Sequence, residues 1–198
     1  MFLNRLGAGA DKLIFIFKEF NANQSAVVLG SLGISRINKD YYPLVVGNHI
    51  LGRLPMASLL FLTIREKYAL TYDATSYFVP LISKGPFLIK LQTTKDKTDF
   101  AKKAVKELLS NYIEHGPTEE ELSSAKKYII GSFRLRTFEN SSLLRSLSSI
   151  AFYNLPKNSL NLFEKNIGSV TQNDVKSSFK KVIDPENLIS IVVGKKDV

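Results

Sequence analysis

Short apolar runs alternate along the chain with amphipathic stretches, and these two patterns predict its strands and helices. Residues 13–17 and 26–32 are compact, β-prone apolar runs, which is typical of buried strands. Residues 71–82 are rich in Thr, Tyr, Phe and Val, which predicts one long strand. Residues 87–93 return after a Ser-Lys-Gly-Pro turn and complete a hairpin. A last apolar run at residues 188–193 predicts a final buried strand.

Helical spacing of apolar residues fills most of the chain between these strands. Asp40 can cap a helix that Gly52 ends, and Pro55 begins the next element. Thr118 with Glu121, and Thr171 with Asp174, have the spacing of capping boxes at helix starts. The predicted helices are residues 41–51, 56–67, 96–115, 118–133, 140–153, 160–167 and 171–183.

This order of elements predicts an α+β fold in one domain, residues 1–198. The final strand follows a long helical stretch, so it must rejoin the earlier strands to bury its apolar side chains. We therefore expect a mixed, mainly antiparallel sheet of about five or six strands, with helices packed on one face. No run of Pro, Gly and Ser divides the chain into two parts.

Composition then excludes several classes of function. The chain has no cysteine, which removes disulfides, thiolate metal sites and a cysteine nucleophile. The net charge of +9 is spread along the chain without a recognition motif, so a nucleic-acid partner is not expected. No apolar stretch is long enough to span a membrane, and residues 1–10 do not resemble a secretory signal. The compartment stays open, with bacterial periplasm or cytoplasm favoured over a membrane.

The search for catalytic and metal-binding residues is negative. The two histidines, His49 and His115, are far apart in sequence and cannot form a helical zinc motif. His115 belongs to the last turn of a predicted helix, and His49 lies between apolar helix positions, so both are interpreted as structural. Glu119, Glu120 and Glu121 form a first helical turn, where carboxylates are favoured by the helix dipole. We therefore expect no catalytic residue and no metal ligand in this chain.

One block of the sequence carries a specific pattern. Its residues, in order, are Gly52, Ser58, Leu60, Phe61, Ile64, Arg65, Glu66, Lys67, Leu70 and Tyr72. In order and spacing, they resemble the C-terminal half of zinc peptidases of the pitrilysin/insulinase family, the inverzincins. Weaker similarity extends over most of the chain. Three positions depart from the family pattern: Arg53 replaces a second glycine, Leu59 replaces an arginine, and Ala69 replaces a glycine.

The resemblance implies a division of labour between two halves. In the family, the N-terminal half binds zinc through a His-x-x-Glu-His motif, and the C-terminal half closes over it. An arginine and a tyrosine of that second half contact the peptide substrate, and they correspond to Arg65 and Tyr72 here. The resemblance thus implies a non-catalytic half that needs no cofactor of its own, with zinc in its partner and peptide as the substrate.

Two points stay open at this stage. The chain is either part of a longer polypeptide or a separate subunit of a homodimer or heterodimer. An alternative to the substrate-binding role is an inactive structural member of the same fold, a scaffold without a peptidase role. A basic nucleic-acid binder is the third and least supported hypothesis.

Overall fold

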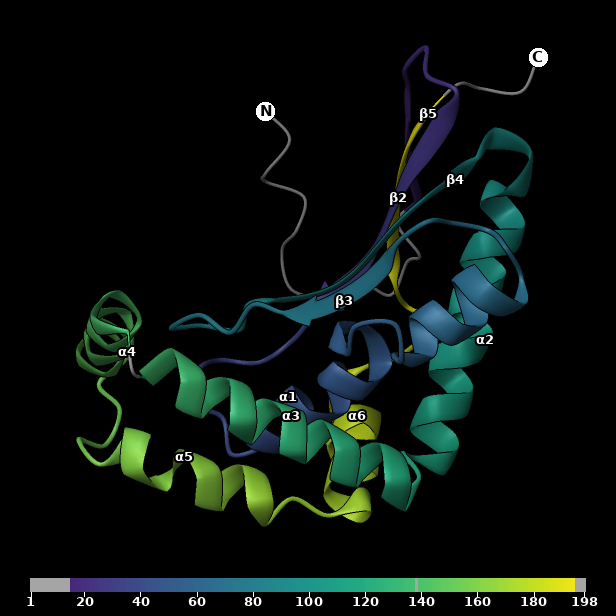
Figure 1. The fold of residues 1–198 in the computed structure, drawn as a ribbon. Helices are drawn as coiled ribbons and strands as arrows, with labels where there is room; N and C mark the ends of the chain where they lie inside the picture. Colours follow the sequence, from purple (N-terminus) through teal and green to yellow (C-terminus); the bar gives the residue numbers. More distant parts are fainter. Residues whose placement is uncertain (1–14, 138, 195–198) are drawn as a thin grey trace.

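A five-stranded sheet forms one layer of the molecule, with the strand order β1-β5-β2-β4-β3. The computed structural model describes residues 15–137 and 139–194 (Figure 1). β1 and β5 are parallel, and the other neighbours are antiparallel, so the predicted mixed, mainly antiparallel sheet is confirmed. The strands are β1 (Phe15–Glu19), β2 (Gln24–Leu32), β3 (Ala74–Phe78), β4 (Pro86–Thr94) and β5 (Ile189–Gly194).

The helices gather on one face of this sheet, which confirms the predicted α+β architecture (Figure 1). Two short segments, η2 and η3, are wound as π-helices, and η4 is a single 3₁₀ turn. The helical elements are α1 (Tyr41–Asn48), η2 (His49–Arg53), η3 (Phe61–Lys67), η4 (Lys95–Lys97), α2 (Thr98–His115), α3 (Glu119–Thr137), α4 (Asn140–Phe152), α5 (Ser159–Gly168) and α6 (Gln172–Val182).

Strict alternation along the central strands decides which face of the sheet is covered. In β4, Phe87, Ile89 and Leu91 are buried, whereas Lys90 and Gln92 are exposed between and beside them. Successive side chains of a strand point to opposite faces, so the apolar set packs on the helices and the polar set faces away from them. The core between sheet and helices includes Val27, Leu29, Leu44, Phe87, Ile89, Leu109, Val175 and Phe179.

Two predicted elements are shorter than expected. The strand predicted over residues 71–82 is confined to β3, so the prediction of one long strand was wrong. Thr71 and Asp73 form a turn before β3, and after it Leu81 pairs with Ser35 instead of with β4. The helix predicted from Met56 begins later, because residues 55–57 form a turn in which Met56 has a φ of 55°. The start of the first predicted strand, residues 13–14, lies outside the described residues.

Both predicted capping boxes are present. The Thr118 backbone N–H donates to Glu121 Oε2 over 2.8 Å, and the Glu121 N–H donates to Thr118 Oγ1 over 3.2 Å. Asp174 and Thr171 make the same reciprocal pair at the start of α6. These caps satisfy backbone donors that the starts of α3 and α6 would otherwise leave free.

Candidate functional site

A tight turn separates Arg65, near the end of η3, from Tyr72, just before β3. Ala69 makes the turn with a left-handed φ of 49°, and its N–H donates to the Arg65 carbonyl over 3.0 Å. Leu70 is only 5% exposed, and its N–H donates to the Ile64 carbonyl over 3.0 Å. The buried leucine thus anchors the turn to the core, while the residues on either side of it reach the surface.

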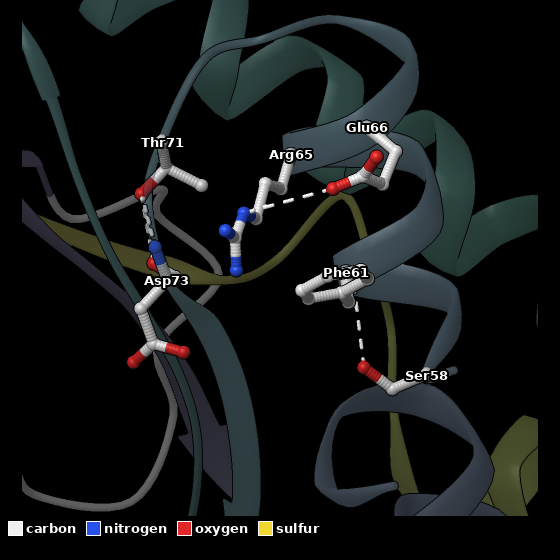
Figure 2. A network of polar contacts seen from close by, with 6 residues as sticks. All are labelled: Ser58, Phe61, Arg65, Glu66, Thr71 and Asp73. Atoms are coloured by element: carbon white, nitrogen blue, oxygen red, sulfur yellow. Dashed lines mark hydrogen bonds and ion pairs between the residues drawn. The ribbon is translucent and has the colours of Figure 1, made fainter. Parts of the chain in front are cut away.

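A second, smaller turn presents Tyr72. The Thr71 hydroxyl donates to the Asp73 carbonyl over 2.8 Å and accepts from the Asp73 N–H over 3.2 Å. Both bonds close around Tyr72, a residue that is 82% exposed. Figure 2 shows this pairing of Thr71 with Asp73 opposite η3. A large aromatic side chain left this exposed by an ordered turn is available for contact with another molecule.

Tyr72 stands beside a shallow groove on the sheet face that the helices leave uncovered. We call it the Tyr72 groove, and its volume is about 370 Å³. Strands β2, β3 and β4 supply most of it, through side chains that point away from the helices. Its lining residues are Gln24, Ala26, Val27, Val28, Thr71, Tyr72, Asp73, Thr75, Tyr77, Lys90, Leu91 and Gln92.

Arg65 lies on the neighbouring helical segment and does not line this groove. Its guanidinium carbon is 4.7 Å from the centroid of the Phe61 ring, and its Nε is 3.7 Å from Glu66 Oε1. Figure 2 shows the guanidinium turned from η3 toward the segment that carries Thr71 and Asp73. With 42% of its side chain exposed, Arg65 keeps donors available to a ligand. In the described part of the chain, no hydrogen bond joins it to Tyr72.

Sequence reasoning missed the other polar residues of the groove. Tyr77, Lys90 and Gln92 lie beside Tyr72 only because β3 and β4 pair in a fixed register, in which Thr75 faces Lys90 and Tyr77 faces Leu88. The alternation of residues 87–93 contains the signal that Lys90 and Gln92 share a face. It contains no signal for their proximity to Tyr72, because that depends on the register of the hairpin.

Comparison with known proteins identifies the family of the chain. The family model described as "Peptidase M16 inactive domain" matches residues 10–129, which is more than half of the chain. The chain belongs to the peptidase M16 inactive-domain family. The resemblance to the zinc-free half of zinc peptidases, inferred from the central block, is therefore confirmed.

Three similar proteins are much longer than the present chain. A peptidase M16 inactive domain from Pseudomonas fluorescens has 32% identity and a TM-score of 0.89, over 94% of this chain and 45% of the solved one. An uncharacterized zinc protease from Streptomyces coelicolor is 26% identical, over 88% of this chain and 38% of its own length. A protease from Helicobacter pylori shares the fold, with a TM-score of 0.84 at 16% identity, over 91% of this chain and 43% of that one. The chain thus spans less than half the length of these relatives.

The described residues of this M16 inactive domain do not fit a zinc ion. Nowhere in residues 15–137 and 139–194 do three His, Asp or Glu side chains gather as a metal site would require. His115 lies in the last turn of α2, and Glu119, Glu120 and Glu121 lie in the first turn of α3, as predicted. Among the same described residues, no helix is both long and apolar enough to cross a membrane.

His49 packs against an aromatic ring of the M16 inactive domain. Its ring packs 4.8 Å from the Tyr128 ring, between centroids, and its Nε2 is buried without a hydrogen-bond partner among the described residues. Burial, and secondarily the charge of Arg53, lower the pKa of His49 from 6.5 to about 4. The imidazole is therefore neutral near pH 7 and packs as an aromatic ring.

The three departures from the family pattern have different structural settings. Arg53 is exposed at the end of η2, and Leu59 packs its side chain against the core. Ala69 holds a left-handed conformation that suits glycine, so the substitution there puts strain into the turn before Tyr72. Gly52 matches the family pattern, and a Cβ there would lie 2.5 Å from the Ser76 backbone nitrogen.

Proposed function

We propose that this chain is the substrate-clamping, zinc-free half of a two-part zinc peptidase. Membership of the M16 inactive-domain family supports the pairing with a zinc-binding half, whether on the same polypeptide or on another. One observation favours substrate contact over a purely structural role: the exposed Tyr72 at the edge of a groove on the uncovered sheet face. Hydrolysis itself belongs to the other half, and this half binds and orients the peptide.

Tyr72 and Arg65 offer the donors that such a role needs. A phenol O–H can donate one hydrogen bond to a peptide carbonyl or to a developing oxyanion, and a guanidinium can donate two in parallel. In the free chain both side chains are partly exposed, so water satisfies them. Closure of the zinc-binding half over them would remove that water, and hydrogen bonds to a charged oxygen strengthen in a drier site.

The proposal is tested by steady-state kinetics on the assembled enzyme. The chain is co-expressed with the half that carries the His-x-x-Glu-His motif, and cleavage of an internally quenched peptide is followed. Tyr72→Phe removes only the phenolic donor, and Arg65→Ala removes the guanidinium. We expect each to lower kcat/KM by on the order of 100-fold, the typical effect of losing one preorganised donor to an oxyanion.

A distant exposed cation provides the control. Arg145 lies on α4, away from the sheet, and Arg145→Ala should leave kcat and KM unchanged. Assembly is followed by size-exclusion chromatography, because a variant that fails to bind the partner half would lose activity for another reason. If both site variants assemble and cleave like the wild type, Tyr72 and Arg65 are not substrate contacts. The chain would then be a scaffold of the same fold.

A further inference from the structure

Lys90 is the one cation that lines the Tyr72 groove, as far as the described residues go. It lies at the centre of β4, between the buried side chains of Ile89 and Leu91, so it must point to the uncovered face. Its neighbours across the sheet are Val28 on β2 and Thr75 on β3. The Lys90 side chain therefore projects from the floor of the groove and not from its rim.

Aromatic packing holds this ammonium over the groove without neutralising it. Lys90 Nζ is 5.1 Å from the centroid of the Tyr77 ring, within the range of a cation–π contact. No carboxylate lies within 4.0 Å of Lys90 in residues 15–137 and 139–194. A lysine that packs on a tyrosine loses part of its side-chain freedom but retains its full charge. It can therefore pair with an anion that a ligand brings.

The one carboxylate among the lining residues belongs to Asp73, and it lies at a different place. Asp73 is part of the turn at the edge of the groove, where its backbone N–H and carbonyl both bond to the Thr71 hydroxyl (Figure 2). Lys90 pairs with Thr75, two residues further along the chain and inside β3. The edge of the groove beside Tyr72 is thus anionic, and its floor is cationic.

We propose that Lys90 makes the Tyr72 groove selective for peptides that lay an acidic side chain on its floor. This inference rests on the proposed function, because it needs a polypeptide that Tyr72 holds at the edge of the same groove. The ammonium would donate to the Asp or Glu carboxylate in an ion pair, beside the flat surface of Tyr77. A lysine or arginine at the same substrate position would meet a like charge and bind less well.

The experiment compares matched peptides on the assembled enzyme. A set of internally quenched peptides differs only by Glu, Gln or Lys at one position, and that position is moved along the peptide. At one position we expect the wild type to cleave the Glu peptide with a kcat/KM about two- to fivefold above the Gln peptide at low salt, the range of a partly exposed ion pair. The preference should shrink as the salt concentration rises.

Two substitutions at Lys90 separate its charge from its shape. Lys90→Gln keeps most of the side-chain length, and the Glu-to-Gln ratio should fall to about one. Lys90→Glu should reverse the preference, so that the Lys peptide becomes the best of the three. Lys84→Glu makes the same change in net charge on the exposed β3–β4 turn, outside the groove, and should leave the ratio at its wild-type value.

The two proposals fail in different ways. If Tyr72→Phe and Arg65→Ala leave cleavage unchanged, the proposed function fails, and Lys90 has no groove-bound substrate to select. If those two variants lower kcat/KM but Lys90→Gln keeps the wild-type Glu-to-Gln ratio at every position, the inference about Lys90 alone is overturned. An equal change in Lys84→Glu and Lys90→Glu would also overturn it, because net charge would then explain the selectivity.

Discussion

At the scale of single residues, Ala69 has an unfavourable backbone conformation in the turn that leads to Tyr72. Its φ of 49° is disfavoured for every residue with a Cβ, by roughly 1–2 kcal/mol, and glycine avoids that cost. Part of this gain is offset because glycine has more freedom in the unfolded chain. We therefore expect Ala69→Gly to raise the free energy of unfolding by about 0.5–1 kcal/mol, measured by urea denaturation.

An alanine with ordinary helical geometry gives the matched control for this change. Ala151 is exposed near the end of α4, and Ala151→Gly should lower the free energy of unfolding by about 0.5–1 kcal/mol. Opposite signs at the two positions would establish that the turn is strained in the folded chain. If Ala69→Gly also destabilised the protein, the left-handed conformation would not be the cost that we infer.

His49 gives the chain a pH-dependent stability. Its pKa is about 4 in the folded chain and near 6.5 when unfolded, so the unfolded chain binds the proton first as the pH falls. The contribution is complete above about pH 6.5, decreases as the pH is lowered, and levels off below about pH 4. Arg53, which adds to this shift, and Tyr128, which packs on the ring, are the groups that face it.

The test compares urea denaturation of the wild type and His49→Phe between pH 7 and pH 4. Phenylalanine keeps a flat ring against Tyr128 and cannot take up a proton. The loss of stability on acidification should therefore be smaller in the variant. The carboxyl of Asp174 also has a lowered pKa, mainly through its hydrogen bond with Thr171, but it contributes equally to both proteins. Parallel pH profiles for the two proteins would show that His49 has no part in the effect.

At the scale of elements, the end of α1 and the following segment η2 cover the free edge of β3 at Ser76. The Asn48 side chain donates to the Ser76 carbonyl over 3.1 Å, and the Ser76 hydroxyl donates back to Asn48 over 2.8 Å. Gly52 lies against the Ser76 backbone nitrogen, where a Cβ would come within 2.5 Å. An edge strand with unpaired backbone groups is a site for pairing with other chains, and this contact blocks it at Ser76.

Because Gly52 lies against β3 and Gly131 lies in open space, alanine at these two positions should change the free energy of unfolding in opposite directions. Gly52→Ala should lower the free energy of unfolding by about 1–3 kcal/mol, because backbone must move to admit the methyl group. Gly131→Ala, on α3, has no atom within 4 Å of the added Cβ and should raise it by about 0.5–1 kcal/mol. Thermal or urea unfolding of both variants measures this. A neutral Gly52→Ala would mean that the segment relaxes without cost.

The helices and central strands were predictable from sequence because their signals are local. Alternation in β4 and the two capping boxes depend on neighbours within a few residues. The length of β3 was not predictable in this way, since β propensity describes a residue and not its partner. Within residues 71–82, only Ala74–Phe78 pairs with β4, and the chain on either side turns away, through Thr71–Asp73 and toward Ser35.

At the scale of the whole molecule, two kinds of evidence were needed to find the candidate site. Arg65 and Tyr72 came from resemblance to a family, since spacing alone did not distinguish them from an ordinary surface arginine and strand tyrosine. The groove beside Tyr72 joins residues from Gln24 to Gln92, and only the pairing of three strands brings them together. Sequence periodicity gives the face of each strand, but the groove appears only when the strands are assembled.

The proposed division of labour between two halves also predicts the metal content of the isolated chain. The described residues provide no group of three His, Asp or Glu side chains, and the chain has no cysteine. After dialysis against a metal-free buffer, elemental analysis should therefore find far less than one zinc per chain, and the chain alone should not cleave peptides. The assembled enzyme should retain about one zinc per pair of halves, because three protein ligands in the zinc-binding half suffice for a catalytic site.

A His115→Gln variant of the isolated chain controls for zinc bound adventitiously at the surface. One zinc retained per isolated chain, and retained in that variant, would contradict the assignment of the metal to the other half.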